Sequence, residues 1–359
     1  MPKPKNIKQP QISLIIPCYN IENYIDACLH SVMVQKNIKR CEIICVDDGS
    51  VDCTSKKLAK YANKYPKTVR LISNRTNFGV SNARNLALNE AQGSTIMFLD
   101  GDDTIGGRPD NKLDTYYLEA FYEMLMNNPG HAMVVGNILV TDQAKNAPVY
   151  NQRFDKLFST STKKVIDSNR ALDFLDTRIS SCATLYRANV INDNNLRFMP
   201  GLTYFEDAHF ITTYAITSAK TYKHMLTTVP DSSFYMYRRR ADSAMTKLSR
   251  HAEKFMRRLE RTQNRMAYYS QLLYRVRDLL GEDSHIYNIV AHRLTQTTKQ
   301  IKEYSEVADT VSYKVLYDYL PYSCVGCIKN RCGICEHNNE LLSSAERCKR
   351  ILLEKVNKR

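Results

Sequence analysis

The chain has 359 residues, 43% of them hydrophobic and 25% charged, which is enough to bury a sizeable core and excludes a disordered or fibrous protein. At this length we expect one large domain with a smaller extension, or two domains. The sequence has no run of about 18 apolar residues, and its first residues, MPKPKNIKQPQ, are polar. We therefore expect a cytoplasmic protein without a membrane span.

The net charge of +14 is concentrated in one part of the chain. Residues 238–277 carry 12 Lys or Arg against 3 Asp or Glu, whereas residues 1–237 carry 27 against 23 and residues 278–359 carry 12 against 11. This distribution predicts a local surface that faces a polyanion.

Short apolar runs alternate with amphipathic stretches over the first hundred residues. Runs typical of buried strands occupy 12–17, 42–46, 69–73 and 94–100. Stretches with helical spacing occupy 22–35, 54–65 and 80–91. Apolar strands separated by helices predict an α/β fold with a mostly parallel sheet, covered on both sides through right-handed crossovers.

The pattern is less regular after residue 104. We expect helices over 112–127 and up to 219, and strands over 131–140, 181–187 and 231–238. From about residue 250 an apolar stripe at helical spacing predicts a helix, formed by Phe255, Leu259, Thr262, Met266, Tyr269, Leu273, Val276 and Leu280. We divide the chain into an α/β domain (1–245) and a helical, basic extension with a Cys cluster (246–359).

Polar residues follow three of the predicted strands, at Pro17–Asn20, Asp47–Ser50 and Asp100–Asp103. In a parallel sheet, ligands bind beyond the carboxyl ends of the strands. Five carboxylates in these segments would repel one another. A cation, or a ligand with many donors, is the simplest compensation.

The motifs ISLIIPCYN, EIICVDDGSVDCT, NFGVSNARNLALNEAQGSTIMFLDGDD and FED follow one another over roughly residues 12–245. In this order and spacing the chain resembles the family 2 glycosyltransferases, inverting enzymes of the GT-A fold, and it is similar to capsular and cell-surface polysaccharide members. The resemblance implies transfer of a sugar from a nucleoside diphosphate sugar, UDP in many members, to a carbohydrate or lipid-linked acceptor. Residues 1–245 would then be the catalytic domain.

The resemblance also implies roles on the donor side. Asp100 and Asp102 would form the Asp-x-Asp motif, which contacts ribose and Mg²⁺ or Mn²⁺, with Asp102 the direct metal ligand. One carboxylate of the Asp47–Asp48 pair would bind the base. Further nucleotide contacts would come from Pro17, Tyr19, Asn20 and Arg84. The structural alternatives are a turn for 100–103, helix capping for 47–48 and a solvated helix arginine at 84.

An inverting transfer needs one carboxylate that takes the proton of the acceptor hydroxyl. Glu206–Asp207 matches the Glu-Asp pair of the family, and Asp207 is the expected base; the alternative is a pair of acids favoured by a helix N-terminus. Arg238 and Arg240 resemble arginines that clamp the departing diphosphate. Alternatively, they begin the basic surface.

The basic segment 238–277 interleaves Arg with Tyr and Leu. It could bind anionic lipid on the cytoplasmic face of the membrane, bind a phosphate-rich polymer such as nucleic acid, or be a solvated helix face. With a glycosyltransferase domain beside it we expect the membrane and no nucleic acid, because many acceptors of the family are lipid-linked.

Two CxxC pairs near the C-terminus predict a structural Zn²⁺ site at Cys324, Cys327, Cys332 and Cys335. Their spacer is short, so His337 or Cys348 could replace one ligand; an iron-sulfur cluster and unligated or disulfide-linked thiols are the alternatives.

Two other functions fit the sequence less well than glycosyl transfer. A sugar-nucleotide nucleotidyltransferase would need a Gly-rich phosphate loop where the chain reads PCYNIENY, and a non-catalytic binding module would not need Asp100, Asp102 and Asp207. No GxGxxG follows the first strand, which disfavours a dinucleotide dehydrogenase.

Overall fold

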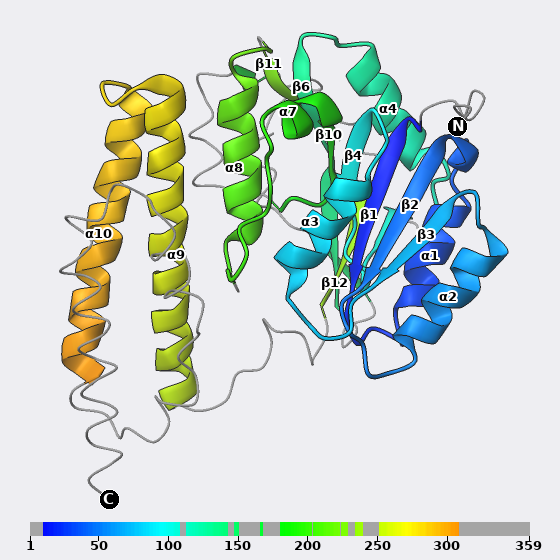
Figure 1. Cartoon of the computed structure of the whole chain (residues 1–359), viewed down its shortest axis with the longest axis horizontal. Coiled ribbons are helices and arrows are strands. Elements are labelled where there is room, and N and C mark those ends of the chain that lie inside the picture. The colour runs from blue at the N-terminus through cyan, green and yellow to red at the C-terminus, as the bar shows by residue number, and fades with distance from the viewer. Residues whose placement is uncertain are drawn as a thin grey trace, which may run out of the picture. The chain divides into compact units, whose positions relative to one another are not determined.

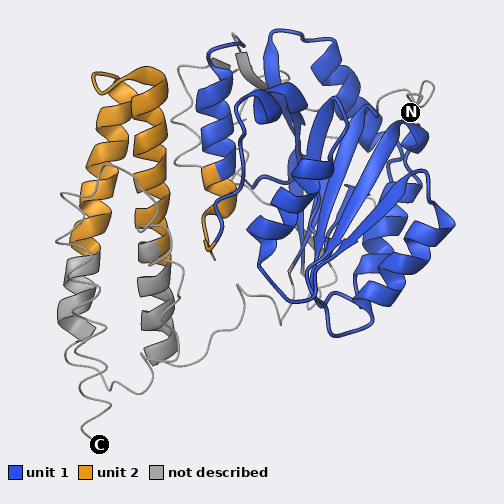
Figure 2. Cartoon of the chain, viewed as in Figure 1, with its two compact units in different colours: residues 1–200, 210–240 blue, residues 201–209, 241–359 orange. Residues whose placement is uncertain are grey.

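The computed structural model describes residues 10–107, 113–142, 147–150, 166–167, 180–202, 204–222, 224–228, 234–239 and 251–308. Two compact units divide the chain, one formed by 1–200 and 210–240 and the other by 201–209 and 241–359 (Figure 2). The domain boundary expected at residue 245 lies outside the described residues and stays a prediction. No described helix combines the length and apolar character that crossing a membrane requires.

The first unit is built on an eight-stranded sheet with the order β3-β2-β1-β4-β10-β6-β11-β9 (Figure 1). Its strands are β1 (Ile12–Cys18), β2 (Cys41–Asp47), β3 (Val69–Ser73), β4 (Thr95–Phe98), β6 (His131–Val135), β9 (Ile166–Asp167), β10 (Thr184–Arg187) and β11 (His224–Thr228). The four N-terminal strands are parallel, and β10 is antiparallel to both β4 and β6. This confirms the predicted α/β class with a mainly parallel sheet.

Helices cover this sheet as the crossover rule requires. Helices α1 and α2 lie on one face and α3 on the other (Figure 1), because the chain moves one way from β1 through β3 and returns past β1 to β4. The helical segments of the first unit are α1 (Ile25–Met33), η1 (Ile38–Arg40), α2 (Thr54–Lys64), α3 (Val80–Glu90), α4 (Tyr117–Met126) and α7 (Ala188–Asp193). Helix α8 (Glu206–Ser218) begins in the second unit and continues in the first.

A second sheet has the order β5-β12-β7-β8. Its strands are β5 (Thr104–Gly107), β7 (Asn137–Asp142), β8 (Ala147–Tyr150) and β12 (Phe234–Arg239). The single strand expected over 131–140 is wrong: Gly136 separates β6 from β7, which belong to different sheets. A side chain at Gly136 would meet the ring of Phe121 at 2.2 Å, so the break lies where the backbone packs closely on α4.

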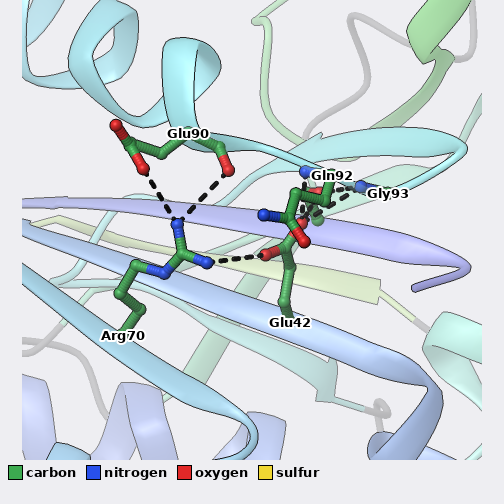
Figure 3. Close-up of polar contacts among 6 residues, drawn as sticks. Glu42, Arg70, Glu90, Gln92 and Gly93 are labelled. Atoms are coloured by element: carbon green, nitrogen blue, oxygen red, sulfur yellow. Dashed lines mark hydrogen bonds and ion pairs between the residues drawn. The ribbon is translucent and has the colours of Figure 1, made fainter. Parts of the chain in front are cut away.

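A buried carboxylate joins the elements at the amino ends of the central strands. Glu42 accepts hydrogen bonds from the backbone N–H of Gln92 (2.6 Å) and Gly93 (3.0 Å) and from the hydroxyl of Ser13 (2.5 Å). Arg70 approaches it at 4.0 Å and pairs with Glu90 at 3.0 Å (Figure 3). These bonds tie β1, β2 and β3 to the turn between α3 and β4.

In the second unit, α9 (His251–Leu280) and α10 (His285–Ala308) form a helical hairpin that turns at Gly281, whose φ is +82°. Four of the expected stripe residues are buried, namely Thr262, Tyr269, Leu273 and Val276. Met266 is half-buried and Leu280 exposed, while Tyr268 and Leu272 are buried. The buried face is therefore wider than the stripe alone indicates.

Candidate functional site

The strand order places a topological switch between β1 and β4, because β2 follows on one side of β1 and β4 lies on the other. Ligands bind at such a point, beyond the carboxyl ends of the strands. The segments that follow β1, β2 and β4 here are 19–24, 48–53 and 99–103. They contain or adjoin most of the expected donor-side residues.

Backbone and side-chain hydrogen bonds join the first two segments. Asn20, with a φ of 51°, receives a hydrogen bond from the N–H of Val51 (2.9 Å) and donates its own N–H to Ser50 Oγ (3.0 Å). The N–H of Ile21 donates to Thr54 Oγ1 at 2.8 Å. Asn20 therefore joins the segments that follow β1 and β2, while Tyr19 is 45% exposed. Pro17 is buried within β1.

The two acids after β2 have different partners. Asp48 accepts hydrogen bonds from Asn74 Nδ2 (2.7 Å) and from the N–H groups of Phe78 (3.1 Å) and Gly79 (2.7 Å). Asp47 accepts the N–H of Ser50 at 3.1 Å. Asp48 thus orders the loop that leads into α3, and both carboxylates are buried at this edge of the sheet.

Arg84 on α3 makes a short ion pair with Asp100: Nη2 lies 2.8 Å from Oδ1. The arginine side chain is 2% exposed and that of Asp100 is 31% exposed. The guanidinium also lies over the ring of Phe198, 4.9 Å from its centroid. Arg84 is therefore not a solvated helix arginine; it fixes Asp100 in place.

The carboxylates in the segment after β4 differ in how deeply they are buried. Asp103 is buried and accepts the hydroxyl of Tyr235 (2.6 Å) and the N–H of Arg238 (2.7 Å). Burial, followed by the charges of Asp102 and Asp100, raises the pKa of the Asp103 carboxyl well above its usual range. Asp103 anchors β12, whereas Asp102 is only half-buried.

The sequence did not single out Asp103 or Tyr235 as site residues. Tyr235 donates to Asp103, and its hydroxyl also receives the N–H of Asp100 at 3.1 Å. The N–H bond from Arg238 to Asp103 places Arg238 next to the acidic loop. Its guanidinium lies 5.2 Å from the ring centroid of Tyr24. The DGDD run was a signal for Asp103, but nothing local pointed to Tyr235.

Metal binding can be judged from the donors present. Across the described residues, no three acidic, His or Cys side chains are grouped to hold a metal ion by themselves. Magnesium, however, is usually bound by one or two carboxylates together with substrate phosphates. Asp100 and Asp102 fit that arrangement, because both reach solvent and both offer oxygen ligands.

Glu206 and Asp207 form the first turn of α8, in the second unit. Phe205 precedes them with a φ of 70°, which is rare for an aromatic residue. Its ring stacks with that of Tyr268 at 6.3 Å, and the guanidinium of Arg265 lies 5.4 Å from its centroid. Arg261 lies similarly over Tyr204, at 5.0 Å. Part of the basic segment therefore supports the loop that presents the acidic pair.

Two expected features fall outside the described residues. These are Arg240 and the cluster Cys324, Cys327, Cys332 and Cys335. Among the other cysteines, Cys18, Cys28, Cys41, Cys45 and Cys182 are buried thiols, whereas Cys53 is exposed.

Curated relatives share sequence with more than half of the chain. A teichoic acid poly(glycerol phosphate) polymerase of Staphylococcus epidermidis is 28% identical over 204 residues, which cover 57% of this chain and 26% of that protein. Minor teichoic acid biosynthesis protein GgaA of Bacillus subtilis is 28% identical over 205 residues, 55% of this chain and 42% of the relative. The chain thus spans less than half the length of both relatives.

The fold is also found in solved structures. Staphylococcus aureus TarS in complex with UDP superposes with a TM-score of 0.55 and 19% identity, covering 86% of this chain and 80% of that one. Finally, the model of glycosyl transferase family 2 matches residues 13–194, half of the chain and all of the segments after β1, β2 and β4. The chain therefore belongs to glycosyl transferase family 2.

Proposed function

We propose that the chain transfers a sugar from a nucleoside diphosphate sugar to a hydroxyl of a carbohydrate or lipid-linked acceptor in cell-surface glycan synthesis, with inversion at the anomeric carbon. The observation that carries the proposal is the cluster formed by Asp47, Asp48 and Asp100 at one sheet edge, with Arg84 paired to Asp100. UDP is the favoured nucleotide, since TarS, which shares the fold at 21% identity, has been solved with UDP-GlcNAc.

On the donor side, the exposed ring of Tyr19 would contact the base beside the carboxylates of Asp47 and Asp48. Asp100, held by Arg84, would contact the ribose. Asp102, with Asp100, would hold Mg²⁺ or Mn²⁺, which supplies charge neutralisation for the departing diphosphate. Arg238, and on sequence grounds Arg240, would bind the diphosphate oxygens.

The chemical step is a single displacement. The acceptor oxygen forms a bond to the anomeric carbon as the bond from that carbon to the diphosphate oxygen breaks, and the hydroxyl proton passes to Asp207. Glu206 would lie beside this base in the first turn of α8. Attachment to an anionic membrane through 238–277, and Zn²⁺ at the C-terminal cysteines, are further proposals that rest on the sequence.

The test is release of nucleoside diphosphate from a panel of sugar nucleotides, with Mg²⁺ or Mn²⁺ and a glycan acceptor. Asp207→Asn should lower kcat by roughly 10²–10⁴-fold and change the KM for the donor by less than about twofold, because no donor contact is proposed for this carboxylate. Asp193→Asn, at an exposed carboxylate, is the matched control and should retain full activity. Turnover by Asp207→Asn at the wild-type rate, or no cleavage of any donor, would contradict the proposal.

A further inference from the structure

A polar groove of about 250 Å³ lies between α9 and α10, within the second unit. Four of its residues come from one face of α10, at positions i, i+3, i+4 and i+7, and two come from α9. The lining residues are Arg265, Tyr269, Arg293, Gln296, Thr297 and Gln300. Two arginines therefore line this groove, and none of the six lining residues is acidic.

The chemistry of the lining points to an anion. Guanidinium groups bind phosphate oxygens through paired hydrogen bonds, and the amide of Gln300 adds neutral donors, while Gln296 Nε2 lies 2.8 Å from His292 Nε2. The volume is below the roughly 300–1,000 Å³ of sites that enclose a whole small molecule, so the groove suits one group of a longer ligand. It has no aliphatic residue that could enter the acyl region of a bilayer, which disfavours a lipid surface as its occupant.

Arg265 connects this groove to the candidate base. Besides lining the groove, its guanidinium lies over the ring of Phe205, the residue before Glu206 and Asp207. Phe205 has a left-handed backbone, which costs energy and persists only when neighbouring contacts hold it. A ligand bound to Arg265 would therefore lie next to the loop that begins α8.

We infer that this groove binds a phosphodiester group of the acceptor, such as one unit of a polyol-phosphate chain. The inference rests on the proposed transfer reaction, which it extends by naming the acceptor class. It agrees with the name of one relative, the poly(glycerol phosphate) polymerase above.

The experiment measures binding of a fluorescent, synthetic glycerol-phosphate hexamer to the full chain by anisotropy, without any sugar nucleotide. Arg265→Gln and Arg293→Gln should each weaken binding by about tenfold, the effect of losing one charged hydrogen-bond donor. Gln300→Lys should tighten binding severalfold, a gain that misfolding cannot produce. Arg277→Gln is the matched control: it lies on α9 outside the groove, near Glu282 at 3.9 Å, and should bind like the wild type.

An uncharged polyglycerol of equal length should not compete with the hexamer. Absence of hexamer binding, or equal binding by the wild type and an Arg265→Gln/Arg293→Gln double variant, would overturn the inference. If Arg265→Gln and Arg293→Gln weakened binding to phosphatidylglycerol vesicles but left hexamer binding unchanged, the inference would be overturned in favour of a membrane contact. Nucleoside diphosphate release by the same preparations separates the two hypotheses. Cleavage without the hexamer effect rejects only the groove. The hexamer effect without cleavage rejects the transfer reaction, and the groove then remains a phosphodiester site but not an acceptor site.

Discussion

At the residue scale, carboxylates that are neighbours in sequence have different roles because their donors differ. Asp48 and Asp103 are buried and accept protein N–H or O–H groups, so they order loops. Asp100 and Asp102 are only half-buried, and Arg84 pairs with Oδ1 of Asp100 at 2.8 Å. A buried acid needs such partners because an unpaired charge in the interior is costly. Solvent access therefore distinguishes Asp100 and Asp102 from Asp48 and Asp103.

The effect of burial on the pKa of a single side chain can be tested at His209. It lies in the first turn of α8, and burial, with a smaller contribution from the charge of Arg275, lowers its pKa from 6.5 to about 4. A folded state with a depressed histidine pKa is stabilised above pH 6.5 and loses that contribution as the pH falls through about 4. The stability advantage of the wild type over His209→Gln should therefore shrink by about 3 kcal/mol between pH 7.5 and pH 4.

Urea unfolding at several pH values measures this difference. His285→Gln, at an exposed histidine of the same unit, is the control, and its stability relative to the wild type should change little with pH. A wild-type advantage over His209→Gln that is constant across the pH range would show that the imidazole is not buried in the folded chain.

The sequence predicted that acids lie at the strand ends, but it did not predict which donors each acid contacts. Strand periodicity and the DGDD run placed Asp47, Asp48, Asp100 and Asp102 at one edge. The donors that distinguish them come from elsewhere in the chain, with Gly79 31 residues after Asp48 and Tyr235 132 residues after Asp103. No local pattern encodes such long-range pairs.

At the element scale, the end of a strand can be decided by packing on another element. Residues 131–140 are predicted as one strand, although Gly136 and Asn137, between the apolar runs HAMVV and ILV, belong to residue types that are depleted in strands. The chain nevertheless changes sheets at Gly136, where the backbone passes the ring of Phe121 on α4. The second sheet was missed because its pairings are long-range: β12 pairs in parallel with β7, about a hundred residues earlier, and antiparallel with the short β5.

Gly136→Ala should therefore lower the free energy of unfolding by about 1–3 kcal/mol, the usual effect of overpacking a core. Its added methyl group would meet the Phe121 ring at 2.2 Å. Gly130→Ala is the control, since a methyl group there meets nothing within 4 Å. Denaturant unfolding would show the effect, and Phe121→Leu should reduce the cost of Gly136→Ala in a double-mutant cycle. Equal stability of the two alanine variants would contradict the packing argument.

At the scale of the whole molecule, the carboxylates at the two ends of the central sheet have different surroundings. The amino ends of β1 and β2 converge on Glu42, whose oxygens are occupied by protein donors (Figure 3). The carboxyl ends present Asp100 and Asp102, with Asp103 adjacent, whose like charges repel one another. Under the proposed function, the acids at the carboxyl ends would bind the donor while Glu42 stabilises the fold at the amino ends.

This separation predicts opposite effects of removing a carboxylate at each end. Glu42→Ala should cost about 2–4 kcal/mol of stability, since it leaves buried N–H groups without acceptors, while the KM for the donor stays within about twofold. Asp102→Asn should leave stability unchanged or raise it by about 1 kcal/mol through reduced repulsion, while nucleoside diphosphate release falls by at least about a hundredfold. Strand β2 rises by roughly 16 Å over the five residues from Glu42 to Asp47, and Asp102 follows the carboxyl end of β4. The stability effects of Glu42→Ala and Asp102→Asn should therefore add within about 0.5 kcal/mol in the double variant. Strong non-additivity, or destabilisation by Asp102→Asn comparable to that of Glu42→Ala, would show that the acidic loop is part of the structural framework and not a site held open for a ligand.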